Sequence, residues 1–138
     1  MKFYLTVFGI AVAATMALTG CGKQLDSEGY FILHGQASWN GEPIKDGLIV
    51  FRTTESGKRN VAASINGGEF DVKIQPGKKT VEITAMREVP GKYALGASGE
   101  KIPAREPFIP KQFNTETELS ADITFPEMTE LNFDLKGS

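Results

Sequence analysis

Apolar and polar residues alternate along most of the chain after residue 30, and turn-forming residues interrupt the alternation every eight to twelve positions. Over Phe31 to Trp39, for example, Leu33 and Ala37 share one face with both end residues, while polar side chains occupy the other. No stretch shows a helical period of useful length. The pattern therefore predicts an all-β domain.

The first predicted turn is Asn40-Gly41, which follows the strand over 31–39. Both central residues of a type I′ turn need positive φ, and Asn and Gly tolerate it best, so a tight hairpin is expected. The next strand, 48–51, is apolar at four successive positions, which favours a central place in a sheet. A short strand over 61–65 comes next.

The cleanest alternation surrounds Pro76-Gly77. Apolar residues occupy every second position over 69–74 and again over 81–85. Proline fixes one φ of the turn and glycine supplies the positive one. The sequence thus predicts a second hairpin between these two strands.

The segment 87–114 holds four of the seven prolines and little alternation, which predicts a long connection. Strands over 119–123 and 131–135 end the chain. About seven short strands with hairpin links and no crossover helix favour an antiparallel β-sandwich.

The N-terminus has the layout of a signal peptide: Lys2, then an apolar run of about 16 residues, shorter than the roughly 20 that span a bilayer. Leu18-Thr19-Gly20-Cys21 resembles the lipobox of bacterial lipoproteins at all four positions. The resemblance implies cleavage before Cys21 and lipidation of its sulfur. The alternatives are a retained membrane helix and an ordinary secretory signal with a cysteine that follows by chance.

The expected domains are a signal peptide (1–20), a lipidated tether (21–29) and a single folded domain (30–138). With Cys21 lipidated, no thiol remains for a disulfide, a metal site or a nucleophile. After removal of residues 1–20, which include Lys2, 14 basic and 17 acidic residues leave a formal charge of −3. That balance argues against nucleic acid as a partner.

Two stretches resemble the carboxypeptidase regulatory-like, transthyretin-like domain family: "LHGQASWNGEPIKDGLIVF" and "GGEFDVKIQPGKKTVEI". The segments "REVPGK", "FIPKQFNTETELSADIT" and "LNFDL" resemble parts of small bacterial lipoproteins that carry one such domain. The resemblance implies a transthyretin-like (prealbumin-like) sandwich that serves as a non-catalytic module. The positions that match the family's turns and core are Gly35, Gly41, Pro43, Gly68, Phe70, Pro76 and Gly77.

Candidate chemistry is sparse. The single histidine, His34, is expected at the surface or between strands, because alternation places it opposite the apolar face. Asp26 and Glu28 lie in the tether, lack the donor pattern of a Ca²⁺ loop, and are expected only to solvate it. No catalytic constellation, metal site or cofactor motif is found.

Two groups of side chains are candidate contact surfaces. Trp39 with Tyr30 and Phe31 suggests a carbohydrate platform, although alternating aromatic residues more often belong to the core. The predicted long connection combines cationic and aromatic residues: Arg87, Lys92, Lys101, Arg105, Lys111, Tyr93, Phe108 and Phe113.

The sequence therefore predicts a protein anchored by lipid in the cell envelope, on the outer membrane or a periplasmic face. The resemblance to lipoproteins of double-membraned bacteria, in which Gly22 rather than Asp would follow the cysteine, implies sorting to the outer membrane. The domain is expected to be a structural or interaction module without enzymatic activity, with an envelope protein or a glycan as partner. The alternative is a carbohydrate or small-ligand binding module at the cell surface.

Overall fold

The computed structural model describes residues 22–137, which form an all-β protein, as the alternation predicts. One short 3₁₀ helix accompanies the strands, and the described residues contain no α-helix. The elements are β1 (Phe31–Trp39), β2 (Glu42–Pro43), β3 (Asp46–Arg52), β4 (Val61–Asn66), β5 (Glu69–Ile74), β6 (Gly77–Leu95), β7 (Lys101–Pro107), η1 (Lys111–Phe113), β8 (Ser120–Ile123) and β9 (Glu130–Leu135).

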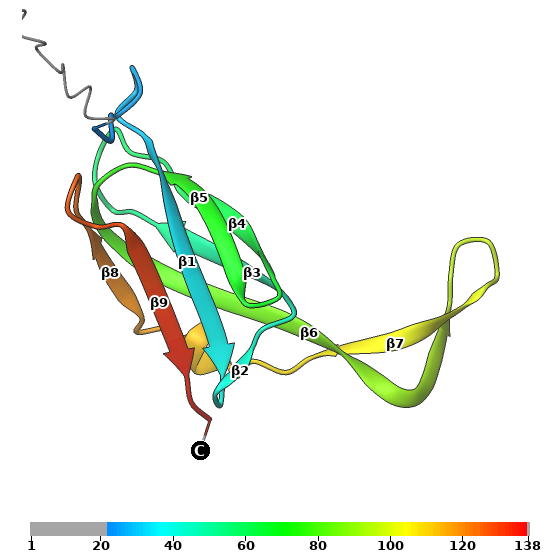
Figure 1. Cartoon of the computed structure of the whole chain (residues 1–138). Coiled ribbons are helices and arrows are strands. Elements are labelled where there is room, and N and C mark those ends of the chain that lie inside the picture. Colours follow the sequence, from blue (N-terminus) through cyan, green and yellow to red (C-terminus); the bar gives the residue numbers. More distant parts are fainter. Residues whose placement is uncertain (1–21, 138) are drawn as a thin grey trace, which may run out of the picture.

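The strands form a sheet that curls over on itself (Figure 1). Its order is β2-β1-β5-β4-β3-β6-β7, with β9 beside β1 and β8 beside β6. Between β4 and β5 only Asn66 and Glu69 pair, so the sheet bends there. The halves β9-β1-β5 and β4-β3-β6-β8 thereby face each other. Neighbours pair antiparallel except β1 and β9, which run parallel and correct the expectation of a purely antiparallel arrangement.

The core fills the space between the two halves. Phe70 of β5 meets Phe51 of β3 across it, with ring centroids 6.2 Å apart. Burying each large apolar side chain contributes roughly 1.5–3 kcal/mol. The central position predicted for residues 48–51 is confirmed, since β3 lies between β4 and β6. The buried apolar residues are Phe31, Leu33, Ala37, Ile44, Ile49, Phe51, Ile65, Phe70, Val72, Ile74, Val81, Ile83, Ala85, Ile109, Ile123 and Leu135.

The predicted turn at Asn40-Gly41 is confirmed. Trp39 pairs with Glu42 across it, which leaves exactly these two residues in the loop. Asn40 has φ 50° and Gly41 has φ 84°, as a type I′ turn requires. The turn directs β2 back along the end of β1.

The hairpin predicted around Pro76-Gly77 is wrong in its pairing. The chain does reverse there, but β5 pairs with β1, while β6 pairs with β3, β7 and β8. The turn therefore carries the chain from one half of the curled sheet to the other. A turn signal indicates where the chain reverses but does not determine which strand becomes the neighbour.

The long connection predicted over 87–114 is also wrong for most of its length. β6 continues to Leu95 and β7 returns from Lys101 to Pro107. Together they form a two-stranded ribbon that projects from the body (Figure 1). Both faces of this ribbon are largely exposed, so it needs no alternation of apolar and polar residues. Periodicity therefore could not reveal it.

Candidate functional site

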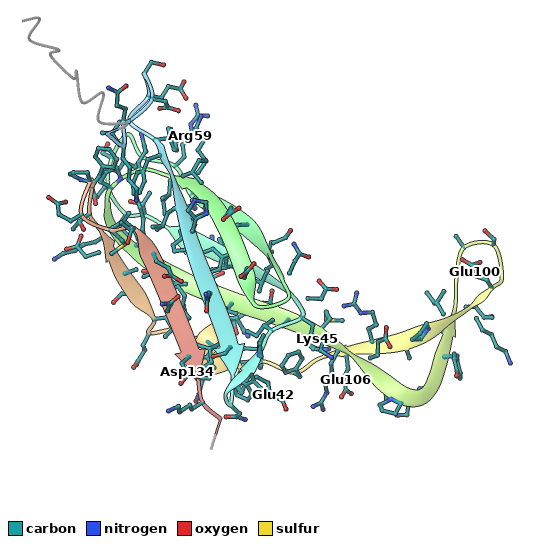
Figure 2. The ribbon with its side chains drawn as sticks, viewed as in Figure 1. Glu42, Lys45, Arg59, Glu100, Glu106 and Asp134 are labelled. Atoms are coloured by element: carbon teal, nitrogen blue, oxygen red, sulfur yellow. The ribbon has the colours of Figure 1, made fainter. Side chains whose placement is uncertain are left out.

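The most prominent candidate surface is the projecting ribbon, residues 86–107, which we call the arm (Figures 1 and 2). Its register shifts between Glu88 and Tyr93, where β6 bulges outward. Three apolar side chains beyond this bulge are exposed to 65%, 76% and 42%, respectively: Tyr93, Leu95 and Ile102. Large exposed apolar residues gathered on a projecting element are typical of a contact surface.

Two ion pairs lie at the base of the arm, and one of them joins the arm to the body. Arg105 of β7 pairs with Asp46 of β3, and Arg87 of β6 pairs with Glu106 of β7 at 2.8 Å. The Arg87 guanidinium also lies 5.7 Å from the centroid of the Phe108 ring. The first pair joins the arm to β3, whereas the second joins the two strands of the arm to each other.

A groove of about 750 Å³ lies at this base, and we call it the arm-base groove. Apolar surface and charge are mixed in it, with acidic and basic side chains in equal number. Among the apolar residues, Met86 is 40% exposed. The residues that line it are Trp39, Glu42, Pro43, Ile44, Lys45, Asp46, Met86, Arg87, Glu88, Arg105 and Phe108.

Trp39 packs against neighbouring aromatic residues. Its ring meets Phe108 and Phe113 edge-on, with centroids 6.4 and 5.9 Å away. The structure does not bring Trp39 together with the other two aromatic residues of that prediction, since Tyr30 and Phe31 lie at the opposite end of β1. The prediction that these aromatic residues belong to the core is confirmed for Phe31, which is buried. Trp39 is partly buried and packs against the core.

The cationic and aromatic residues predicted in the long connection separate into groups. Arg87, Arg105 and Phe108 belong to the arm base, and Lys92, Tyr93 and Lys101 to the outer part of the arm. Lys111 and Phe113 lie on η1. The predicted group is therefore divided among the base of the arm, its outer part and η1.

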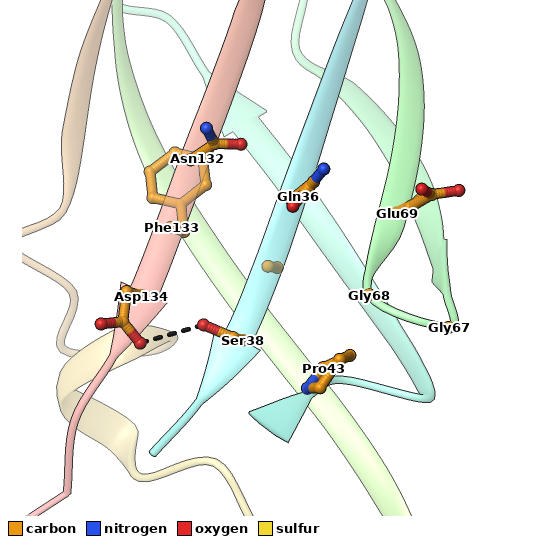
Figure 3. Close-up of a pocket in the computed structure, with 10 residues that line it drawn as sticks. Gln36, Ser38, Pro43, Gly67, Gly68, Glu69, Asn132, Phe133 and Asp134 are labelled. Atoms are coloured by element: carbon orange, nitrogen blue, oxygen red, sulfur yellow. Dashed lines mark hydrogen bonds between the residues drawn. The ribbon is translucent and has the colours of Figure 1, made fainter. Parts of the chain in front are cut away.

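A second hollow, of about 440 Å³, is lined by the paired strands β1 and β9, by Pro43 and by the turn that leads from β4 into β5 (Figure 3). We call it the sheet-face pocket. Ser38 Oγ donates to Asp134 Oδ1 at 2.9 Å across it, and Gln36, Glu69 and Asn132 line it with further amide and carboxylate groups. Such groups are suited to hydrogen-bond a polar ligand. Nothing in the sequence pattern had indicated that they converge.

His34 lies on the exposed face of β1, as alternation predicts, and pairs across the sheet with Asp71 of β5. Both side chains are mostly exposed. The described residues contain no group of three His, Cys, Asp or Glu side chains that could hold a metal ion.

The tether is more structured than the sequence suggests. Asp26 Oδ1 accepts hydrogen bonds from the backbone N–H groups of Glu28 at 3.0 Å and Tyr30 at 2.8 Å. Lys73 Nζ lies 2.7 Å from Asp26 Oδ2, and this hydrogen-bonded pair lowers the pKa of Asp26. Gln75 Nε2 also donates to the Glu28 carbonyl at 2.8 Å. Asp26 thus fixes the entry to β1 instead of only solvating the tether.

The predicted lipid-attachment residue, Cys21, lies outside the described residues, as does the signal peptide. Across residues 22–137, no helix has the length and apolar character needed to cross a membrane.

Comparison with known proteins gives one structural likeness. No family model and no curated protein matches the chain. A 9R-lipoxygenase from Cyanothece PCC8801 matches 79% of the chain with a TM-score of 0.31 and 11% identity, and the chain spans 16% of that protein's length. The matched protein is an enzyme, so the comparison does not bear out the expectation of a protein without enzymatic activity, and that expectation is withdrawn. At this level of similarity the match assigns no reaction to the chain.

Proposed function

We propose that this protein is a lipid-anchored component of the cell envelope whose β domain presents the arm as an interaction surface. The anchor is the diacylglyceryl group expected on Cys21, supported by the complete lipobox. One acyl chain holds a protein only marginally at a bilayer, whereas two or three hold it stably.

The observation that carries this proposal is the placement of the arm relative to the tether. The tether leads into the first residue of β1, and the arm-base groove includes the last residue of β1, Trp39. A nine-residue strand spans about 30 Å, so the arm lies one domain length away from the anchored end. An arm so placed meets partners beyond the membrane surface.

We further propose that the curled sheet is a sandwich of the carboxypeptidase regulatory-like, transthyretin-like type. The shared core between the two halves supports this proposal. So does Gly35, a motif position whose backbone lies against the ring of Phe70, another motif position. A Cβ at Gly35 would overlap that ring, so the two residues are matched to each other.

Metabolic labelling tests the anchor. Radiolabelled palmitate should enter the full chain and should not enter Cys21→Ser, which should leave the membrane fraction. Gly22→Ala is the matched control, because nothing lies within 4 Å of a Cβ at Gly22, and it should label like the wild type. Equal labelling of the wild type and Cys21→Ser would refute the anchor.

A second candidate function is the binding of a carbohydrate or another polar ligand, and the sheet-face pocket favours it. A glycan array of the full chain in detergent should then show saturable binding that Gln36→Ala abolishes, since Gln36 lines the pocket and is exposed. His34→Ala, two residues away on the same face, should retain it. Binding unaffected by Gln36→Ala would exclude this pocket.

A further inference from the structure

The outer part of the arm and the arm-base groove carry opposite sets of charges. Three charged residues of the groove, Asp46, Arg87 and Arg105, enter the ion pairs of the base, and the other charged residues that line it are Glu42, Glu88 and Lys45. Across the described residues, none of the latter three enters an ion pair. The unpaired charges of the groove are therefore two carboxylates and one ammonium group, a net charge of −1.

The outer arm carries the reverse set: Lys92, Lys101 and Glu100. These side chains are also absent from the ion pairs of the described residues. Figure 2 shows Glu100 at the far end of the arm, and Glu42 and Lys45 near its base. Two acidic residues and one lysine in the groove thus correspond to two lysines and one acidic residue at the tip.

The apolar surfaces of the two regions correspond as well. Tyr93 and Leu95, at alternate positions of β6, share one face of the outer arm and are exposed to 65% and 76%. The groove offers Met86, which is 40% exposed, beside Trp39 and Phe108. Aromatic and aliphatic anchors surrounded by charged residues are typical of protein interfaces.

An arm cannot place its tip in its own groove. The seven residues of β7 separate the two ends by about 20 Å of extended strand. When two identical arms lie antiparallel about a two-fold axis, however, the tip of each lies beside the base of the other. The two-fold axis generates both tip-to-base contacts, because each arm presents the same two surfaces to the other.

The arm is also poorly suited to recruit an extra strand. Pro90, Pro103 and Pro107 each remove a backbone donor from the ribbon. Prolines on exposed strands oppose edge-to-edge pairing. Contacts through the side chains of its faces are therefore favoured over strand addition.

We propose that the occupant of the arm-base groove is the arm tip of a second copy of this chain, so that two copies exchange arms in a symmetric dimer. The inference rests on the proposed role of the arm as an interaction surface. A shared membrane would add to it by raising the local concentration of the chains.

Photo-cross-linking of the full chain in membranes tests this proposal. Two copies with different tags are co-expressed, with benzoylphenylalanine in place of Tyr93. We expect a product that contains both tags, with the cross-linked peptide within residues 39–46 or 86–88. The same probe in place of Ile32, which is 51% exposed at the far end of β1, should give no such product.

Charge reversal adds a specific test. Lys92→Glu with Lys101→Glu would set like charges against the groove and should lower the yield of the product roughly tenfold. Glu42→Lys with Glu88→Lys in the same chain should restore it. Lys78→Glu with Lys111→Glu changes the net charge equally, away from the arm tip, and should have no effect.

The absence of a product with both tags, a probe at position 93 that cross-links only to another protein or to lipid, or a cross-link that maps elsewhere on the second copy would overturn the exchange of arms. Cross-linking to another protein would still support the arm as an interaction surface, which separates the two proposals. As a second measurement, analytical ultracentrifugation in detergent should show a dimer that Tyr93→Ser with Leu95→Ser converts to a monomer. A wild type that is monomeric at every concentration would also refute the proposal.

Discussion

Lys79 is a cationic residue at a core position, and replacing it should stabilise the protein. It precedes Val81 and Ile83 on the inward face of β6 and is only 3% exposed. No described group forms a hydrogen bond with its Nζ atom. Burial lowers the pKa of Lys79, the nearby charge of Lys58 lowers it further, and Glu55 opposes the shift.

The size of the effect follows from the unpaired amine. A buried donor without a partner costs about 1–3 kcal/mol, and methionine retains most of the length and apolar stem without that donor. Lys79→Met should therefore raise the free energy of unfolding by about 1–3 kcal/mol. For a domain of this size, the melting temperature should rise by roughly 4–12 °C. Lys78→Met, the exposed neighbour, is the control and should change stability by less than about 0.5 kcal/mol.

The pH dependence of the free energy of unfolding provides a second test. Because the pKa of Lys79 is lower in the folded state than its ordinary value of 10.5, the unfolded chain binds more protons between the two values. The part of the penalty that comes from the charge is therefore fully present below the folded pKa and disappears as the pH rises through 10.5. Urea unfolding near pH 7 and near pH 10 should show the advantage of Lys79→Met shrinking with pH. A variant no more stable than the wild type near pH 7, or an advantage that does not change with pH, would refute the reasoning.

Two further predictions concern the entry to β1 and its middle. Asp26→Asn removes the ion pair with Lys73, so hydrogen exchange of the backbone amides of residues 26–30 should accelerate. In the wild type, the same exchange should accelerate as the pH falls through the lowered pKa of Asp26. Unchanged exchange in both experiments would contradict this role of Asp26. Gly35→Ala places a Cβ against the ring of Phe70 and should lower the free energy of unfolding, measured in urea, by about 3 kcal/mol. Gly22→Ala is the control and should leave that free energy almost unchanged. Similar values for both variants would show that the sheet adjusts to the added Cβ.

The sequence predicts the body of the fold well because local chemistry determines it there. The alternation over 31–39 and 69–74 corresponds to strands with one buried face. Asn40-Gly41 forms the expected turn, since few other residues accept positive φ at both positions. These features require no knowledge of distant parts of the chain.

What the sequence did not predict depends on partners far along the chain. Alternation places Lys79 on the same face as Val81 and Ile83, but nothing in the local sequence shows that the core also covers this lysine. Asp26 has a polar local context, and its role depends on Lys73, which the fold brings beside it. The sheet-face pocket likewise joins β1, β5 and β9, so no single segment contains its pattern.

The arm shows how one strand serves both the core and a contact surface. β6 runs for 19 residues without a break, alternating between buried and exposed up to Ala85 and mostly exposed from Met86 onward. An isolated two-stranded ribbon is marginally stable in water, so the arm depends on the register that β6 acquires inside the body. The pair between Arg105 and Asp46 lies at the transition and links the ribbon to β3. Substitutions beyond that pair should therefore change what the arm binds while leaving the core, and with it the fold, intact.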